Sequence, residues 1–362
     1  MKTFNLYKLS LVLAIISLLV ALAMIFSSGL PQAGPYMIAF FFFLGIGFRG
    51  YDNLKGFTYS IMIFAAVTTA LYYPENFVEL NGFKLATLII PLIQIIMFGM
   101  GTSMSVDDFV GVVKTPRAVF IGIGSQFVIM PALGFTLANL SGFEPEIAAG
   151  IILIGCSPSG LASNVMNYLA KANLALSITI TSVTTLLAPL VTPLLMKLLA
   201  GEMVEINMLA MMWDICKMVI LPIGAGLLFN KVLHGKSKWL DAAMPLVSML
   251  GIGLIITIIT AAGRNSLLEI GFLLIVLVLI HNLSGYTIGY WTGRLFKMNE
   301  KDCRTIAIEV GMQNGGLASG IAKEMGKIAT IGLAAAVFGP LMNITGSILA
   351  SYWHRRPPME DE

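Results

Sequence analysis

The sequence has little charge. Charged residues make up 11% of its 362 residues, whereas a soluble globular protein carries roughly 25%. Hydrophobic residues reach 57%, so water is not the main solvent of this chain. A hydrocarbon core about 30 Å thick needs ~20 apolar residues for each crossing helix. The composition therefore predicts an all-α polytopic membrane protein, with the lipid bilayer as its main partner.

Cysteine and histidine are also scarce, with three residues of each. The cysteines show no CxxC or other metal-type spacing and the histidines lie far apart, so neither a disulfide framework nor a metalloenzyme motif is indicated. The basic residues form short clusters between apolar runs, and the net charge is only +3, which argues against nucleic acid as a partner. We expect no enzyme, and no obligatory protein partner is evident.

Twelve apolar runs, separated by Gly, Pro and charge clusters, occupy the chain from about residue 9 to residue 353. If the runs cross the membrane alternately, most of the 22 Lys and Arg residues fall on the side of the N-terminus. Because basic loops stay in the cytoplasm, this predicts that both termini are cytoplasmic. The first run resembles a secretion signal, but it is long and no clear A-x-A cleavage site follows it. We expect a retained helix.

One short sequence occurs twice. Residues 160–163 (Gly-Leu-Ala-Ser) in the sixth run recur as residues 316–319 in the eleventh. Runs five apart cross the membrane in opposite directions, as in transporters built from inverted repeats. Helix-breaking residues 157–160 and 311–316 accompany the two copies. Since a broken helix is tolerated in a bilayer only where it is buried in protein or lines a watery cavity, the two breaks predict a transport site.

Glu309 is the central polar residue near these breaks. A carboxylate within a membrane segment usually has a partner or a function. Gln313 lies four residues later, on the same helix face if the helix continues that far. In the alternative interpretation, Glu309 lies near the cytoplasmic interface and pairs with Arg304 or Lys301. Carboxylate, amide, hydroxyl and backbone oxygens together suit a hard cation such as Na⁺.

Other polar residues lie on the neighbouring runs. Ser163 and Asn164 follow the first break. Ser177 and Thr181 are four residues apart on the next helix, a spacing that aligns two hydroxyls, although each hydroxyl can instead bond to its own helix backbone. Gln126 is polar on an otherwise apolar helix, where lipid does not favour it.

Together these segments resemble the bile acid:sodium symporter family. The most specific matches are residues 162–166 (Ala-Ser-Asn-Val-Met), 168–170 (Tyr-Leu-Ala), 173–177 and 309–314 (Glu-Val-Gly-Met-Gln-Asn). The resemblance implies a panel domain and a core domain, built from inverted five-helix repeats, with two broken helices that cross in the core.

The resemblance also implies a domain organisation. A ten-helix transporter unit would extend over residues 57–353, with repeats at 57–200 and 201–353. Residues 1–56 would add two N-terminal transmembrane helices, and residues 354–362 would form a short cytoplasmic tail.

Two sodium sites and a small organic anion as substrate follow from the same resemblance. The first sodium site would use Ser163, Asn164, Ser177, Thr181 and Glu309. The second would use Gln126, Glu309, Gln313 and the backbone carbonyls of Val310 and Met312. The anion would bind beside the breaks, near Gly160, Asn314 and Asn343.

The resemblance predicts sodium-coupled symport of a bile-acid-like anion or a small carboxylate or sulfonate, by alternating access. One alternative is an anion efflux carrier of the arsenite-exporter type, which relies on a cysteine in an equivalent broken helix, and Cys156 lies close to the first break. The other alternative is a membrane ligand sensor that does not transport. Leu161 and Met342 replace polar residues found in some family members, so the identity of the anion stays open.

Overall fold

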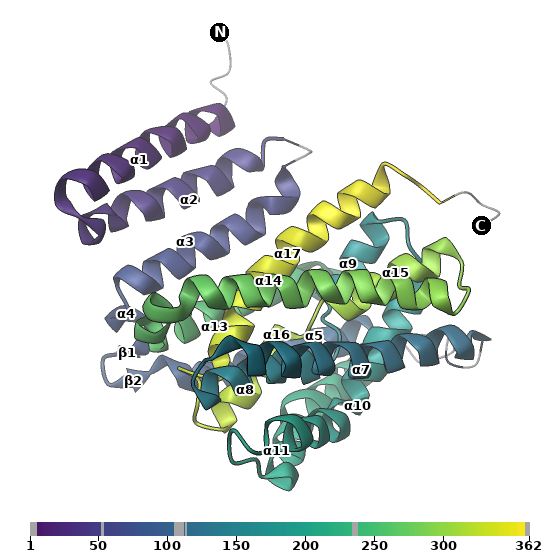
Figure 1. Cartoon of the computed structure of the whole chain (residues 1–362). Helices are drawn as coiled ribbons and strands as arrows, with labels where there is room; N and C mark the ends of the chain where they lie inside the picture. Colours follow the sequence, from purple (N-terminus) through teal and green to yellow (C-terminus); the bar gives the residue numbers. More distant parts are fainter. Residues whose placement is uncertain (1–5, 52–53, 105–111, 113, 234–237, 359–362) are drawn as a thin grey trace.

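The computed structural model describes residues 6–51, 54–104, 112, 114–233 and 238–358, and most of these residues lie in helices (Figure 1). The helices before residue 201 are α1 (Leu6–Ser28), α2 (Gly34–Phe48), α3 (Thr58–Tyr72), α4 (Glu75–Val78), α5 (Ile89–Ser103), α7 (Pro116–Ser141), α8 (Pro145–Cys156), α9 (Ala162–Leu169) and α10 (Leu174–Ala200). Those after it are α11 (Met208–Ile215), α12 (Leu221–Leu233), α13 (Lys238–Ala262), α14 (Arg264–Leu295), α15 (Glu300–Gly311), α16 (Gly315–Glu324) and α17 (Gly332–His354).

Short elements complete the described chain. They are the 3₁₀-helices η1 (Leu30–Ala33), η2 (Lys55–Phe57) and η3 (Leu85–Leu88), the π-helix η5 (Cys216–Ile220), and the two-residue antiparallel strands β1 (Glu79–Leu80) and β2 (Phe83–Lys84). Because η5 joins α11 to α12, these three elements form one continuous span from Met208 to Val232.

Eight of the described helical segments are long and apolar enough to cross a membrane. The four other predicted runs contain shorter helices: α3, the apolar part of α13 (Leu246–Ala262), and the interrupted pairs α8–α9 and α15–α16. Each interrupted pair consists of two half-helices, neither of which reaches the ~20 residues that a crossing requires. An all-α polytopic membrane protein is thereby confirmed.

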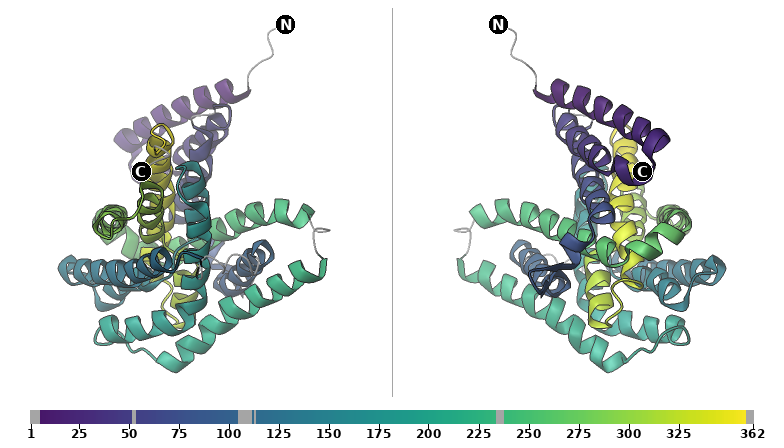
Figure 2. Two further views of the ribbon diagram at one scale, coloured as in Figure 1. Left: turned by 90° about the vertical axis from the view of Figure 1, so that its right-hand side faces the viewer. Right: turned by 90° about the vertical axis from the view of Figure 1, so that its left-hand side faces the viewer.

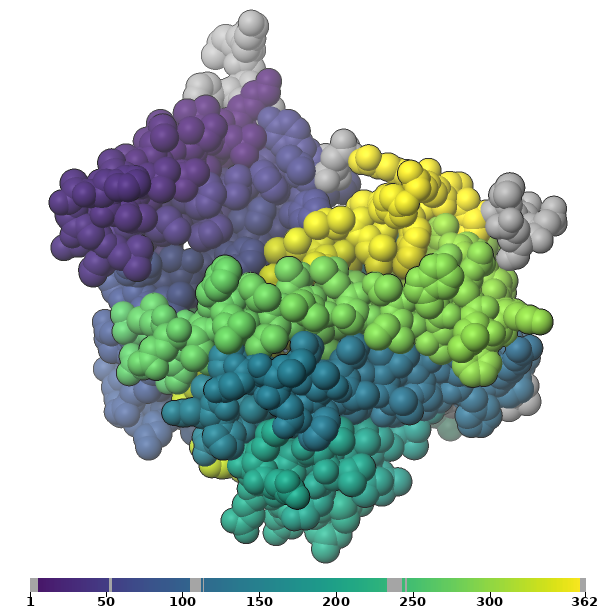
Figure 3. Space-filling model, in the orientation of Figure 1, coloured from purple at the N-terminus to yellow at the C-terminus, as the bar shows by residue number. Residues whose placement is uncertain are grey.

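The first two helices lie at the edge of the molecule (Figure 1). They form an antiparallel hairpin that packs on α3, and the space-filling view shows the hairpin protruding from the rest of the protein (Figure 3). Within the hydrophobic window of α1, 17% of the residues are buried, compared with 61% in α17. Most of the α1 surface is therefore available to lipid.

The remaining helices pack in two groups. In one group, α5 contacts both α12 and α13, and α3 contacts α13. In Figure 2, α12 and α13 extend together to one side of the molecule. In the other group, α7, α10, α14 and α17 surround the two interrupted helices. The predicted division into repeats at residues 57–200 and 201–353 stays a prediction.

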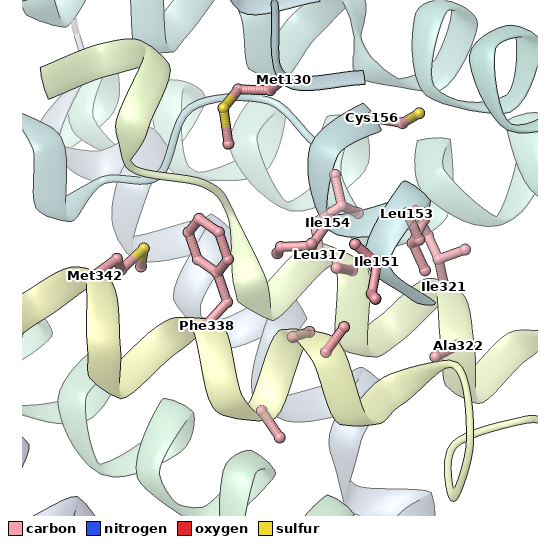
Figure 4. Packing of buried hydrophobic residues seen from close by; sticks show 14 of the residues in the cluster. Met130, Ile151, Leu153, Ile154, Cys156, Leu317, Ile321, Ala322, Phe338 and Met342 are labelled. Atoms are coloured by element: carbon pink, nitrogen blue, oxygen red, sulfur yellow. The ribbon is translucent and has the colours of Figure 1, made fainter. Parts of the chain in front are cut away.

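The half-helices α8 and α16 meet against α17 in a closely packed apolar core. Figure 4 shows Ile151 and Ile154 of α8 facing Leu317 of α16 and Phe338 of α17, and each of these side chains is fully buried. Small residues permit this close packing, as is common between membrane helices. A Cβ atom at Gly150, for example, would lie 2.5 Å from the carbonyl oxygen of Ile331.

Candidate functional site

Both interruptions have local causes. Pro158 has no backbone N–H, and the residue before a proline avoids helical geometry. Accordingly, α8 ends at Cys156 and Ser157 is extended. In the second interruption, Asn314 caps α16, because its Oδ1 atom accepts a hydrogen bond of 3.0 Å from the backbone N–H of Leu317. An asparagine in this position favours the start of a new helix.

The two interruptions cross each other. Ser159 and Gln313 form an isolated antiparallel bridge. The backbone N–H of Gly160 donates to the carbonyl of Met312 at 2.9 Å, and that of Asn314 donates to the carbonyl of Pro158 at 2.8 Å. Backbone groups released from the helices thus bond to one another, which removes the cost of leaving them unpaired in a membrane.

The carboxylate of Glu309 lies beside this crossing and is fully buried. Its Oε1 atom accepts hydrogen bonds from Ser163 Oγ at 2.6 Å and from Ser177 Oγ at 2.6 Å. Asn167 Nδ2 donates to the same oxygen at 3.2 Å. Thr181 Oγ1 donates to Oε2 at 2.7 Å. Residues from α9 and α10 therefore converge on one carboxylate carried by α15.

The alternative placement of Glu309 at the interface, paired with Arg304 or Lys301, is wrong. Arg304 pairs with Glu300 at 2.7 Å, and Lys301 is exposed. In the part of the chain that the structure describes, no ion pair includes Glu309. With a rise of 1.5 Å per residue, Glu309 lies about 13 Å along α15 from its first residue, well inside the protein.

Asn164 joins the same group of side chains. Its Oδ1 atom lies 2.7 Å from Ser177 Oγ and 3.4 Å from Thr181 Oγ1, so each hydroxyl can donate its single hydrogen either to Asn164 or to Glu309. The hydroxyls of Ser177 and Thr181 thus point away from their own helix backbone, whereas Thr184 Oγ1 on the same helix donates to the carbonyl of Ile180 at 2.8 Å. All five side chains predicted for the first sodium site therefore lie together.

The residues predicted for the second sodium site also lie near the crossing. Gln126 Nε2 donates to Gln313 Oε1 at 2.7 Å, and Gln313 Nε2 donates to the carbonyl of Val310 at 2.6 Å. The carbonyl of Met312 accepts from Gly160 instead. Since α15 ends at Gly311, Gln313 does not continue the helix face of Glu309, and the Glu309 carboxylate turns toward α9 and α10.

The three residues predicted near the substrate do not form one cluster. Gly160 and Asn314 lie in the crossing itself. Asn343 lies on α17, is half-buried, and donates through Nδ2 to the carbonyl of Gly339 in its own helix at 2.8 Å. No hydrogen bond between described residues joins Asn343 to either of the other two.

Asn167 also belongs to the site, although it was not among the residues predicted from the sequence. This residue lies four positions after Ser163 on α9, so the two share a helix face. That spacing is the signal that places Asn167 in the same cluster. It is fully buried and contacts both Glu309 and Ser177.

The known proteins that this chain resembles are sodium-dependent transporters by name. The profile of the sodium bile acid symporter family matches residues 90–270. The chain is 37% identical to the uncharacterized sodium-dependent transporter YocS of Bacillus subtilis over 309 residues, which cover 85% of this chain and 94% of that protein. It is 31% identical to the probable sodium/metabolite cotransporter BASS1, chloroplastic, of Arabidopsis thaliana, over 75% of this chain and 67% of the relative. It is 32% identical to the probable sodium/metabolite cotransporter BASS3, chloroplastic, of rice (Oryza sativa), over 81% of this chain and 69% of the relative.

Proposed function

Since this chain belongs to the sodium bile acid symporter family, and is therefore a membrane transporter rather than an enzyme, we propose that it couples the movement of a small organic anion to that of Na⁺. The sodium gradient across a bacterial inner membrane would drive uptake. The transported anion would be bile-acid-like, or a small carboxylate or sulfonate.

The observation that carries the proposal is the environment of Glu309. A buried carboxylate is costly unless a charge compensates it, and the described ion pairs do not include Glu309. Its contacts are instead hydroxyl and amide groups. Each hydroxyl can rotate to present a lone pair, so Na⁺ beside Glu309 would find the oxygen ligands that a hard cation prefers. We assign the first ion to Ser163, Asn164, Ser177, Thr181 and Glu309.

We assign a second ion to the amide pair across the crossing. Gln126 and Gln313 are both fully buried and exchange hydrogen bonds. Turning both amide oxygens toward one point, together with the carbonyl of Val310, would give a neutral oxygen site beside Glu309. The carbonyl of Met312 would join these ligands only if its bond to the N–H of Gly160 lengthened.

The anion would bind where half-helices begin. Helices α9 and α16 start at the crossing, and helix N-termini favour negative charge because their N–H groups point outward. Gly160 and Asn314 line this position, and Asn343 would approach it from α17 during transport. Sodium bound between α9, α10 and α15 would hold the half-helices in the arrangement that receives the anion.

In the proposed mechanism, the helices around the crossing rock against α3, α5, α12 and α13, so that the site opens to alternate sides. The membrane potential contributes about 2.3 kcal/mol per elementary charge per 100 mV. Two sodium ions moving with one monovalent anion carry a net positive charge inward. Uptake would then respond to voltage as well as to the sodium gradient.

A thermal-shift screen tests this function. The purified protein would be heated with small carboxylates and sulfonates, in NaCl and separately in KCl. Because a ligand that binds only the folded state raises the unfolding temperature, a cognate anion should stabilise the protein only in NaCl. Glu309→Ala should remove the sodium effect while the protein still reaches the membrane. Equal stabilisation in both salts, or sodium-driven uptake by Glu309→Ala, would contradict the proposal.

Family membership favours symport over the two alternatives. Cys156, on which an arsenite-type exporter would depend, is fully buried in the apolar core, and a Cys156→Ala variant with normal transport would remove that alternative. Counterflow of the labelled anion in proteoliposomes distinguishes a carrier from a sensor, because a sensor binds the anion without moving it.

A further inference from the structure

Asn167 is in direct contact with the Glu309 cluster, but its carboxamide is only half satisfied. Its Nδ2 atom donates to Ser177 Oγ at 2.9 Å and to Glu309 Oε1 at 3.2 Å. Its Oδ1 atom is buried and has no hydrogen-bond partner among the described residues. A buried acceptor without a partner has lost its hydration with no compensating hydrogen bond, so this oxygen calls for an explanation.

Asn164, one helical turn earlier on α9, makes the opposite use of its amide. Its oxygen, rather than its nitrogen, faces the hydroxyls of Ser177 and Thr181. The two asparagines therefore present opposite ends of their carboxamides to the hydroxyl of Ser177. A half-turn about the Cβ–Cγ bond of Asn167 would exchange its ends, and this torsion is broad and roughly two-fold.

We propose that Asn167 is an additional ligand of the cation that binds at Glu309. This inference rests on the proposed function. The NH₂ group of Asn167 bonds to the Glu309 carboxylate and to Ser177. A half-turn of the amide would bring the Asn167 oxygen to a cation held by Glu309 and Ser177. The move gives the orphaned oxygen a strong partner, and it takes the NH₂ group away from a positive charge that would repel it.

Asn167→Leu and Asn167→Asp make the test specific. Leucine is close to asparagine in shape and supplies neither donor nor acceptor, whereas aspartate keeps the oxygen and removes the donor. If the oxygen binds the ion, Asn167→Leu raises the sodium concentration for half-maximal stabilisation about tenfold or more, and Asn167→Asp leaves it at or below the wild-type value. If Asn167 only donates to Glu309, loss of the donor leaves the carboxylate freer to bind the ion, so neither variant raises the sodium concentration for half-maximal stabilisation.

The measurement is the unfolding temperature of the full-length protein as NaCl replaces KCl at constant total salt. Thr184→Val is the matched control, because Thr184 is equally buried on α10 and its hydroxyl donates to the carbonyls of Ile180 and Thr181; its sodium midpoint should not move. Should Asn167→Leu fail to fold, Asn167→Ala, which is smaller and also lacks the amide, takes its place with the same expected rise in the sodium midpoint.

The failure of this inference differs from the failure of the proposed function. Sodium midpoints that are equal in wild type and Asn167→Leu, or a loss of sodium binding in Asn167→Asp, overturn the role of Asn167 and leave the symporter intact. A wild-type protein that NaCl stabilises no more than KCl does overturns the sodium site itself, and Asn167 with it.

Discussion

At the scale of single residues, the crossing depends on a glycine. A Cβ atom at Gly160 would lie 2.6 Å from the backbone carbonyl oxygen of Gln313, and backbone cannot move aside as a flexible side chain can. We therefore predict that Gly160→Ala pushes the two interruptions apart and weakens the hydrogen bond from Gly160 to Met312. The expected loss is about 1–3 kcal/mol of unfolding free energy, together with weaker sodium binding.

Gly124→Ala is the control for this substitution. A Cβ atom at Gly124 on α7 would meet nothing within 4 Å, so alanine there should be neutral or slightly stabilising, because it lowers the entropy of the unfolded chain. Unfolding in mixed detergent micelles and sodium-dependent thermal shifts would be measured for both variants. If Gly160→Ala behaved like Gly124→Ala, the close backbone contact would not matter for the site.

Residue chemistry also explains what the sequence could predict of the site. Glu309, Ser163 and Ser177 are polar where lipid penalises polarity, so the sequence marks them as candidates, but it left open whether Glu309 pairs at the interface and whether the Ser177 hydroxyl bonds to its own helix. Asn167 shares the helix face of Ser163, so its spacing of four residues from Ser163 also indicates a place in the cluster. The orientation of the Asn167 amide, with its nitrogen toward Glu309 and Ser177, depends on residues of other helices, which local patterns do not encode.

At the scale of elements, the two interrupted helices are tied together at both ends. At one end, Glu146 in the first turn of α8 pairs with Lys327 and accepts a hydrogen bond of 2.7 Å from Thr330, and both partners lie between α16 and α17. At the other end, Asp302 in the first turn of α15 accepts from Asn173, between α9 and α10, at 2.8 Å. Helix α8 is thus anchored to the loop that follows α16, and helix α15 is anchored to the loop that follows α9.

At the end where α15 begins, the crossing is also stabilised by a buried cation, Arg304. The guanidinium of Arg304 pairs with Glu300 and donates to the carbonyls of Ala170, Trp353 and Arg356 at 3.4, 3.3 and 2.9 Å. Removal of one partner from a buried ion pair costs about 3–5 kcal/mol. We predict a loss of this size in the unfolding free energy of Arg304→Met, because Glu300 and three carbonyls lose a donor together.

Lys327→Met provides the comparison at the other end. The side chains of Lys327 and Glu146 are 34% and 36% exposed, and exposed pairs contribute only about 0.2–1 kcal/mol. Unfolding of both variants in mixed micelles should therefore rank Arg304→Met well below Lys327→Met in stability. Equal losses would mean that burial does not set the strength of the two ties.

The positions of the elements were largely readable from the sequence, but their mutual contacts were not. Pro158 with its flanking serines marked the first interruption, glycines and Asn314 marked the second, and the α-helical class followed from apolar runs. The end of α15 at Gly311 agrees with the break predicted over residues 311–316, but the sequence did not show which residues the freed backbone groups would pair with. The helix ends there because the carbonyl of Met312 and the N–H of Asn314 bond to the other interruption, and such long-range pairing overrides local propensity.

At the scale of the whole molecule, the positive-inside pattern predicts one orientation in the membrane. The loop between α14 and α15 would lie in the cytoplasm, and the loop between α10 and α11 would face outward. Glu146 and Lys327 would then lie on the outer side, and Arg304 on the inner side. In this orientation the more strongly tied end of the crossing faces the cytoplasm, and the weaker tie faces the side from which Na⁺ enters.

Cysteine labelling in intact cells tests this orientation. Glu202 and Lys301 are both exposed, one in the expected outer loop and the other in the first turn of α15. With Cys156, Cys216 and Cys303 replaced by serine, we predict that a membrane-impermeant maleimide labels Glu202→Cys in intact cells and labels Lys301→Cys only after lysis. Sodium-dependent thermal stabilisation of each variant would verify the fold. The reverse labelling pattern would show that the molecule has the opposite orientation in the membrane, with the buried Arg304 network on the outer side.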